Sequence, residues 1–267
     1  MTNDSPFRLA ASSYLNSAPL IWSFLNGSHR GNVDFVEAVP SRCSQLLSES
    51  AVEGALVPVI EYQRIPSGCL VPDVCVGSQK EVLSVVLVSK NRQLEKISSV
   101  ALDESSRTSA TLVKVIFREF LHLEPEWTTR APDVEQMLEK HDAALIIGDP
   151  GMTFRRRGLN VWDMASLWKQ HTGLGFVFAM WMVRDEVIER ARMVDFAGAR
   201  DEGVAHLEEI VGSYQDKIPI PVEEVRNYLT ENIVFNVDQS MEKGLQLYFE
   251  LAFKHKLIER VKPLRFI

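Results

Sequence analysis

The feature that most constrains the fold of this chain is an alternation of short apolar runs and amphipathic segments in its first 60 residues. The apolar runs predict buried strands, and the segments between them have the spacing of short helices. A strand–helix–strand–helix–strand order favours parallel βαβ units whose helices cover the sheet. The predicted strands are residues 7–11, 33–39 and 54–60, and the predicted helices are residues 20–25 and 41–48.

A second cycle of the same kind follows a longer predicted strand at residues 82–89. The chain returns through an apolar strand at residues 176–183 and is helical from Asp185 onward. We predict an α/β fold of two lobes around a central cleft, with a helical C-terminal segment. Lobe 1 comprises residues 1–88 plus 184–267, and lobe 2 comprises residues 89–183. Ligands of such folds bind beyond the carboxyl ends of the strands, which here means the cleft.

Composition limits the class of protein. The 267 residues are 46% hydrophobic and 24% charged, which excludes a disordered tail, a collagen-like fibre and a disulfide scaffold. The formal net charge is −7. An acidic surface argues against binding to nucleic acid or to an anionic membrane, so an anionic ligand has to be held by local donors.

Cysteine and histidine usage gives no metal or disulfide pattern. Cys43, Cys69 and Cys75 form an odd set without short paired spacings, and the six histidines are scattered. We therefore expect a reducing compartment and no metal. The first residues lack the basic start and apolar run of a secretory signal, and no stretch approaches the roughly 20 apolar residues of a membrane span. The expected location is the cytoplasm.

The segment between the first predicted strand and helix carries the strongest candidate site. Asn16 lies at the carboxyl end of the strand, before Ser17, which can cap the helix, and Pro19, which suits a first turn. Such a helix start points free N–H groups at the cleft. The Asn16 amide can donate to a carboxylate or hydroxyl of a ligand, or it only stabilises its own turn.

Residues 105–111 repeat this arrangement in the second lobe. Hydroxyls and backbone N–H groups of Ser106, Thr108 and Ser109 meet at a helix start, and Arg107 can add a charge with fork geometry. The alternative is plain capping beside a solvated arginine. Two such helix starts on two lobes fit a ligand with two anionic groups.

Two further polar residues are weaker candidates. Ser84 begins an apolar run near the predicted crossing between the lobes, and its hydroxyl faces either the cleft or another side of the strand. Asp149 follows the predicted strand at residues 143–148 and either orients the cleft or makes an Asx-turn before Pro150. The motifs of nucleotide hydrolysis, hydride transfer and serine hydrolysis do not occur.

Six segments stand in a recognisable order along the chain. They are YLNSAPL (14–20), GALVPVIEY (54–62), SVVLVS (84–89), SRTS (106–109), IGD (147–149) and TGLGFVFAMW (172–181). Together they resemble the chorismate dehydratase family of the futalosine route to menaquinone. The resemblance extends from about residue 7 to residue 181 and is looser in the helical tail.

The resemblance implies a fold, a reaction and a set of site residues. It implies a type II periplasmic binding-protein-like fold, removal of water from chorismate to give 3-[(1-carboxyvinyl)oxy]benzoate, and no metal or organic cofactor. Asn16 matches the family's asparagine, which is expected to be central to catalysis. Ser84, Ser106, Thr108 and Ser109 match positions that are expected to line the substrate cleft.

Two departures from the family pattern concern loops near the cleft. Pro150 and Gly151 stand where the family commonly has alanine and leucine, and Gly175 stands where a proline often precedes the apolar strand. These departures affect the expected loops and leave the expected fold unchanged.

The chemistry of chorismate agrees with these residues. Chorismate carries two carboxylates and one ring hydroxyl, and loss of that hydroxyl with a neighbouring ring proton makes the ring aromatic. The matched motifs contain no obvious strong base. We hypothesise that Asn16 orients the substrate and polarises its reacting groups while the proton passes to the substrate's own enolpyruvyl carboxylate.

Other functions fit the same pattern. A non-catalytic small-anion binding protein can use the same fold. The sister naphthoate-forming enzyme of the pathway shares the fold but needs a roomier cleft, and the Tyr-Leu-Asn-Ser segment favours the dehydratase. An effector domain of a transcription regulator is a weaker alternative, because no DNA-binding helix pair precedes the first strand.

Overall fold

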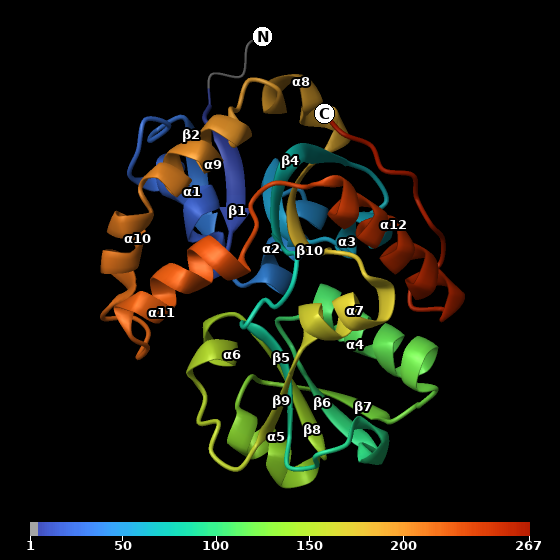
Figure 1. Ribbon diagram of the computed structural model, residues 1–267. Helices are drawn as coiled ribbons and strands as arrows, with labels where there is room; N and C mark the ends of the chain where they lie inside the picture. Colours follow the sequence, from blue (N-terminus) through green and yellow to red (C-terminus); the bar gives the residue numbers. More distant parts are fainter. Residues whose placement is uncertain (1–4) are drawn as a thin grey trace.

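Two five-stranded sheets with their covering helices form the two lobes of the chain (Figure 1). The computed structural model describes residues 5–267. The strand order is β2-β1-β3-β10-β4 in the first sheet and β7-β6-β8-β5-β9 in the second. The predicted two-lobed α/β architecture is therefore confirmed. The strands are β1 (Phe7–Ala11), β2 (Val33–Glu37), β3 (Gly54–Pro58), β4 (Cys69–Ser78), β5 (Val85–Ser89), β6 (Ser99–Asp103), β7 (Glu126–Arg130), β8 (Ala143–Ile147), β9 (Asn160–Asp163) and β10 (Phe176–Val183).

The helices of the described residues are mostly short. Single 3₁₀ turns span Leu15–Ser17, Leu94–Lys96 and Asp185–Val187, and π-helical turns span Ile116–Leu121 and Tyr228–Asn232. The α-helices are α1 (Ala18–Leu25), α2 (Pro40–Ser48), α3 (Glu61–Arg64), α4 (Thr108–Val115), α5 (Val134–Lys140), α6 (Asp149–Thr153), α7 (Met164–Thr172), α8 (Ile188–Ala191), α9 (Phe196–Ala205), α10 (Leu207–Tyr214), α11 (Val222–Asn227) and α12 (Gln239–Lys254).

Strand direction follows from the connections between strands. β1 pairs in parallel with β2 and β3, because a helix carries the chain back between these strands. β6 likewise pairs in parallel with β7 and β8. β10 is antiparallel to β3 and β4, and β5 is antiparallel to β8 and β9. Each sheet is therefore mixed.

The crossings between the lobes differ from the predicted boundaries. Those boundaries place β10 and all of β5 except its last residue on the wrong sides: β5 belongs to the second sheet and β10 to the first. The chain thus leaves the first lobe before residue 85 and returns before residue 176. Both strands are apolar runs beside a crossing. An apolar run does not specify which sheet it joins, because pairing with distant strands decides that.

Among the strands and α-helices, five have no counterpart in the predicted pattern: β4, β9, α3, α6 and α7. β4 contains Pro72 and Asp73, and Asp73 has a φ of 55°. Its register with β10 is also irregular. These interruptions break the apolar alternation from which a strand is predicted.

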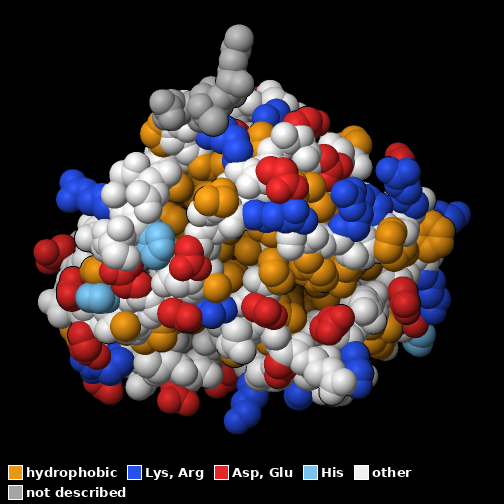
Figure 2. Space-filling view, turned by 90° about the horizontal axis from the view of Figure 1, so that it is seen from above, with side chains coloured by type: hydrophobic (Ala, Val, Ile, Leu, Met, Phe, Trp, Pro, Cys, Tyr) orange, Lys and Arg blue, Asp and Glu red, His pale blue; other side chains and the backbone are white. Residues whose placement is uncertain are grey.

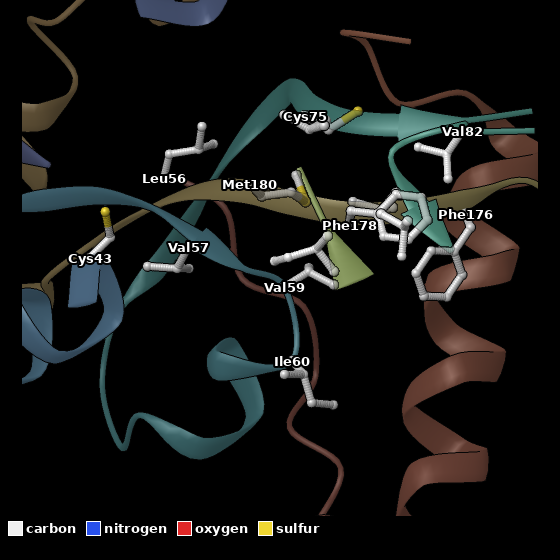
Figure 3. Packing of buried hydrophobic residues seen from close by; sticks show 14 of the residues in the cluster. Cys43, Leu56, Val57, Val59, Ile60, Cys75, Val82, Phe176, Phe178 and Met180 are labelled. Carbon is white, nitrogen blue, oxygen red and sulfur yellow. The ribbon is translucent and has the colours of Figure 1, made fainter. Parts of the chain in front are cut away.

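Most buried apolar side chains belong to one cluster that continues from the first lobe into the second. Figure 3 shows part of this cluster, with Phe176 and Phe178 of β10 next to each other; their ring centres are 4.8 Å apart. Alternate residues of β5 point to the two faces of the second sheet, as the period of a strand requires. Val85 and Leu87 join the large cluster, and Val86 and Val88 join a smaller one.

The C-terminal segment connects the two lobes. α12 packs against β10 and against α4, and the Tyr248 hydroxyl donates to the backbone oxygen of Thr108 at 2.9 Å. In Figure 1, α11 lies at the level where the two halves meet, and α12 runs beside the upper half down to that level. The last residues extend along β4, where Leu70 N donates to the backbone oxygen of Arg265 at 2.8 Å. The helical tail therefore helps to position the region between the lobes.

Acidic, basic and hydrophobic side chains are interspersed on the face shown in Figure 2. Within residues 5–267, no helix is long and apolar enough to cross a membrane. The three cysteines are buried and unpaired, and the same residues contain no cluster of side chains suited to a metal ion.

Candidate active site

A cavity lies between the lobes, at the carboxyl ends of strands from both sheets. The space between its lining residues is about 510 Å³, including solvent at the open side of the cavity. Parallel strands bring their carboxyl ends and the following helix starts to one edge, so this is where a ligand site is expected. The polar lining residues are Ser12, Tyr14, Asn16, Ser17, Ser106, Arg107, Thr108 and Ser109, and the others are Pro40, Leu56, Pro58, Val76, Val85, Ile147, Gly148, Phe178 and Ala179.

The predicted catalytic residue, Asn16, lines this cavity. It belongs to the 3₁₀ turn that follows β1 and leads directly into α1. The Ser17 hydroxyl donates to the side-chain oxygen of Asn16 at 3.1 Å and lies 3.0 Å from the Ser12 hydroxyl. The amide oxygen of Asn16 thus accepts from Ser17, and its NH₂ can donate to a ligand.

Ser17 lines the cavity but does not act as the predicted cap. It occupies the N-cap position of α1, yet its side chain makes no capping hydrogen bond. Its backbone has φ −96° and ψ −16°, which is close to helical because the 3₁₀ turn continues into α1. A capping side chain normally requires an extended backbone at that position. The Ser17 hydroxyl instead orients the Asn16 amide.

Asp149 is not among the residues that line the cavity, although it was a predicted substrate contact. Its carboxylate accepts the backbone N–H of Leu15 at 2.9 Å, at the start of the turn before α1. At the first of the two predicted anion sites, a carboxylate of the protein itself therefore accepts a backbone N–H. A carboxylate is a favourable partner for a helix start. Burial raises the pKa of the Asp149 carboxyl, whereas the Leu15 N–H and the charge of Lys217 act to lower it.

Replacing Asp149 with asparagine should change how stability depends on pH. Because the pKa of Asp149 is raised in the folded state, the folded protein holds this proton more tightly than the unfolded chain does. The parent therefore loses stability as the pH rises above about 4. Asp149→Asn keeps an acceptor for Leu15 and removes the titration, so its melting temperature should exceed that of the parent at neutral pH. The excess should disappear below about pH 4.

In a control for this experiment, the melting temperature at neutral pH should change in the opposite direction. Hydrogen bonds from Ser98 hold the pKa of Asp142 below its ordinary value, and Asp142 does not line the cavity. This carboxylate stabilises the fold above its unfolded-state pKa, and the contribution is lost as the pH falls through the folded-state pKa. Asp142→Asn should lower the melting temperature at neutral pH and have less effect in acid. A loss of stability at neutral pH in Asp149→Asn would contradict the assignment of Asp149.

The second helix start borders the cavity as predicted. Thr108 and Ser109, the first residues of α4, are buried in the cavity wall together with Ser106. Thr108 is fixed from both sides, because its Oγ1 accepts the Ile60 N–H at 3.3 Å and its backbone oxygen accepts the Tyr248 hydroxyl. The Ser106 hydroxyl accepts the N–H of Ala110 at 3.2 Å, so part of its role is capping. This helix start can still present hydroxyl and N–H donors to an anion.

Arg107 is exposed and lines the cavity. It occupies the N-cap position of α4 without making a side-chain capping hydrogen bond. Among the lining residues of the described chain, it is the only one with a cationic side chain. Its guanidinium therefore adds a full positive charge to the helix start, in a protein whose net charge is −7.

Ser84 lies behind the cavity wall and does not line it. Its side chain is fully buried, and its hydroxyl accepts a hydrogen bond from the Tyr228 hydroxyl at 2.7 Å. The next residue, Val85, lines the cavity instead, because successive side chains of a strand point to opposite faces. A direct contact between Ser84 and a ligand therefore stays a prediction that this cavity does not support.

Tyr14 and Gly148 form a part of the cavity wall that the sequence analysis did not single out as a site. A Cβ at position 148 would lie 2.6 Å from two ring carbons of Tyr14, so only glycine permits this contact. Burial raises the pKa of the Tyr14 hydroxyl, against a lowering hydrogen bond from Ser105. Both residues belong to segments that carry the family resemblance, and this resemblance is the sequence signal that could have identified them as site residues.

The cavity has donors for anions but few groups that can remove a proton. Among its described lining residues, none has a carboxylate, imidazole, amine or thiol side chain. Asp103 is buried nearby, but its carboxylate accepts the N–H and hydroxyl of Ser105 and the N–H of Ile147. The arrangement can therefore bind and orient a small anion with a hydroxyl group and polarise it through Asn16.

Comparison with known proteins identifies the family of the chain. Residues 7–254 match a family described as menaquinone biosynthesis. The chain belongs to this family. The match covers nearly all of the described residues, including the helical tail, and confirms the resemblance drawn from the ordered motifs.

Two curated relatives of this family member are named chorismate dehydratase. The protein of Thermus thermophilus is 28% identical over 264 residues, which cover 92% of this chain and 94% of the relative. The protein of Campylobacter jejuni is 25% identical over 237 residues, which cover 88% of each chain. Both names denote hydro-lyases, in agreement with the predicted class of enzyme.

Solved structures support the fold of this family member. A protein of Archaeoglobus fulgidus superimposes with a TM-score of 0.78 at 16% identity and covers 96% of this chain and all of its own. The periplasmic aliphatic sulphonate binding protein of Escherichia coli has a TM-score of 0.63 at 13% identity and covers 98% of this chain and 94% of its own. The predicted type II periplasmic binding-protein-like fold is confirmed.

Proposed function

We propose that this protein removes water from chorismate to give 3-[(1-carboxyvinyl)oxy]benzoate. The observation that carries the proposal is the cavity between the lobes, in which a side-chain amide and a positively charged helix start face a space without a strong protein base. The curated relatives named chorismate dehydratase support it. Other small anions fit the donors, but the family relation favours chorismate.

The two lobes contribute different binding groups to the cavity. Arg107 and the donors that open α4 take one carboxylate of the substrate. Asn16 lies on the other lobe, where its NH₂ donates to the ring hydroxyl or to the second carboxylate. Apolar side chains such as Leu56 and Phe178 pack against the ring and exclude water.

The reaction needs a proton acceptor that the cavity wall does not supply. We place this role on the substrate, whose enolpyruvyl carboxylate takes the ring proton adjacent to the departing hydroxyl. The C–H electron pair forms the new double bond of the ring, the C–O bond to the hydroxyl breaks, and the carboxylate proton passes to that hydroxyl as water leaves. The fixed donors hold this geometry and compensate the developing charge, which is the main contribution of the protein.

A direct assay tests the proposed function. Purified protein at trace concentration is incubated with chorismate, and the absorbance and product mass are followed with time. Catalytic conversion to a product lighter by one water supports the proposal. A spectral change that saturates at one ligand per protein, with no product, indicates a small-anion binding protein and overturns it. No interaction with chorismate overturns it in favour of a different substrate, such as the naphthoate precursor of the sister enzyme.

Arg107→Met should raise the KM for chorismate by about tenfold. An exposed charge-assisted hydrogen bond to a carboxylate contributes on the order of 1.4 kcal/mol, which corresponds to a tenfold change in affinity. kcat should change less, because Arg107 lies at the binding end of the cavity. Arg156→Met is the matched control, since it changes the net charge equally in an exposed loop of the same lobe. Equal effects of both variants would assign the loss to net charge alone.

A further inference from the structure

A second hollow adjoins the cavity, and Arg107 lines both of them. One side of this hollow is formed by α2 and α3 of the first lobe, whereas Arg107 stands at the start of α4 in the second lobe. The chain also passes directly from one to the other, because Pro40 lines the cavity and the next residue, Ser41, lines the hollow. We call this hollow the arginine groove, after Arg42, Arg64 and Arg107. It lies between the lobes, next to the cavity.

Basic side chains outnumber acidic side chains in the arginine groove. Its three arginines are accompanied by two carboxylates, Glu49 and Glu61. In each of three other hollows on the described surface, the Lys and Arg side chains are equal in number to the Asp and Glu side chains. The formal net charge of the chain is −7, so the protein as a whole repels an anion. A groove of positive charge between protein walls focuses the field and concentrates anions locally.

Arg64 connects the two sides of the arginine groove. Its Nη1 donates to the Glu61 carboxylate of α3 at 2.8 Å, and its Nη2 donates to the Thr111 Oγ1 of α4 at 3.1 Å. Thr111 lies within one helical turn of Thr108, which lines the cavity. Residues of both lobes therefore set the position of this guanidinium.

The charges of the other two arginines are less compensated. The Arg42 Nη1 lies 3.4 Å from the Glu49 carboxylate, and the two side chains are 45% and 49% exposed. Among the described residues, no carboxylate forms an ion pair with Arg107. The least compensated positive charge of the groove therefore lies at its boundary with the cavity.

We propose that the arginine groove is the path by which a small dianion enters the cavity, and that Arg42 and Arg64 guide one of its carboxylates toward Arg107. The inference rests on the proposed function only for the identity of the dianion, which is chorismate. A guanidinium binds a carboxylate through two parallel N–H groups, so the incoming carboxylate has a partner at each stage of the path. Guidance of this kind raises the rate of association and leaves the chemical step unchanged.

A blocking experiment tests the path itself. The three natural cysteines are buried, so a thiol reagent modifies an introduced surface cysteine selectively. Gln45→Cys places a thiol at an exposed position of α2 in the arginine groove, where it is modified with a bulky neutral maleimide. The probe is 5-fluoroisophthalate, an unreactive benzene ring with two carboxylates, whose association and dissociation rates follow from ¹⁹F line shapes. The control is Ser213→Cys with the same label, at an exposed position of α10 that lines neither the cavity nor the groove.

The label at position 45 should lower the association and dissociation rates of the probe together, by about tenfold or more, and leave its Kd close to that of the parent. An obstacle in a path slows passage in both directions and does not change the equilibrium between the free and bound states. The labelled control should keep the parental rates. A parental association rate in labelled Gln45→Cys overturns the inference. A weaker Kd with a parental dissociation rate also overturns it, because the label then acts on binding in the cavity.

A charge substitution tests the guidance. Arg42→Gln should lower the association rate of the probe by about two- to fivefold at low ionic strength. The difference should vanish in about 1 M salt, where the screening length is about 3 Å. Arg30→Gln is the matched control, since it makes the same change of net charge at an exposed position of the same lobe and lines neither hollow. Equal effects of the two variants overturn the guiding role of Arg42.

The probe separates failure of this inference from failure of the proposed function. If the parent does not convert chorismate but the label at position 45 slows the probe in both directions, the proposed function fails and the entry path stands. If the parent converts chorismate and the labelled variant binds the probe at parental rates, only the entry path fails. A parent that does not bind the probe at all also overturns the entry path.

Discussion

Asn16→Asp should lower kcat/KM for chorismate by about 100- to 1,000-fold, the range observed when one preorganised donor is removed from an active site. The substitution keeps the size of the side chain and the oxygen that accepts from Ser17. It removes the NH₂ donor, and it places a negative charge beside a substrate that carries two. The loss should therefore appear in both kcat and KM, as measured by steady-state kinetics.

A control for this prediction uses the same chemical change elsewhere on the first lobe. Asn32 is exposed in the loop before β2 and does not line the cavity. Asn32→Asp adds the same charge, so it should retain parental kinetics. If Asn16→Asp converts chorismate at the parental rate, Asn16 has no catalytic role.

Gly148→Ala should lower the free energy of unfolding by about 2–3 kcal/mol. Gly148 has φ 67° and ψ −151°, a region that is essentially restricted to glycine. The added Cβ would also lie 2.6 Å from the ring of Tyr14, which must then move out of the cavity wall. For a chain of this size, the melting temperature should fall by about 5–10 °C. The displaced ring should also raise the KM for chorismate.

Gly158→Ala separates the two causes of this loss. Gly158 has a φ of 78°, but no atom lies within 4 Å of the added Cβ. It should show only the cost of a left-handed backbone, about 1 kcal/mol, with parental KM. If both variants lose the same stability and keep the same KM, the contact between Tyr14 and Gly148 has no role in the site.

The candidate site was only partly predictable from sequence. Asn16, Ser17 and residues 106–109 were found because each lies where a predicted strand gives way to a predicted helix, and all of them line the cavity. Asp149 was singled out just after the end of a predicted strand and Ser84 at the start of another, but both lie outside the cavity wall. Their partners are Leu15 and Tyr228, at separations of 134 and 144 residues. No local pattern indicates contacts of that range.

The helical tail also makes long-range contacts that its local sequence pattern does not predict. The pattern from residue 185 onward predicts helices, and Asp238 caps α12 by accepting the N–H of Met241 at 2.8 Å. The pattern does not show that Tyr228 and Tyr248 from this tail bind residues of the site. Their hydroxyls gave no signal, because a buried tyrosine in an amphipathic helix normally packs in the core.

Local patterns in the chain are enough to locate most of the strands and helices and the strand ends that carry polar side chains. They are enough because apolar period, capping residues and turn chemistry act over a few neighbouring residues. Long-range packing establishes which sheet β5 and β10 complete, that Asp149 occupies the first helix start, and that Tyr228 contacts Ser84. Those outcomes depend on packing between segments more than 50 residues apart, where the side chains that meet share no local period.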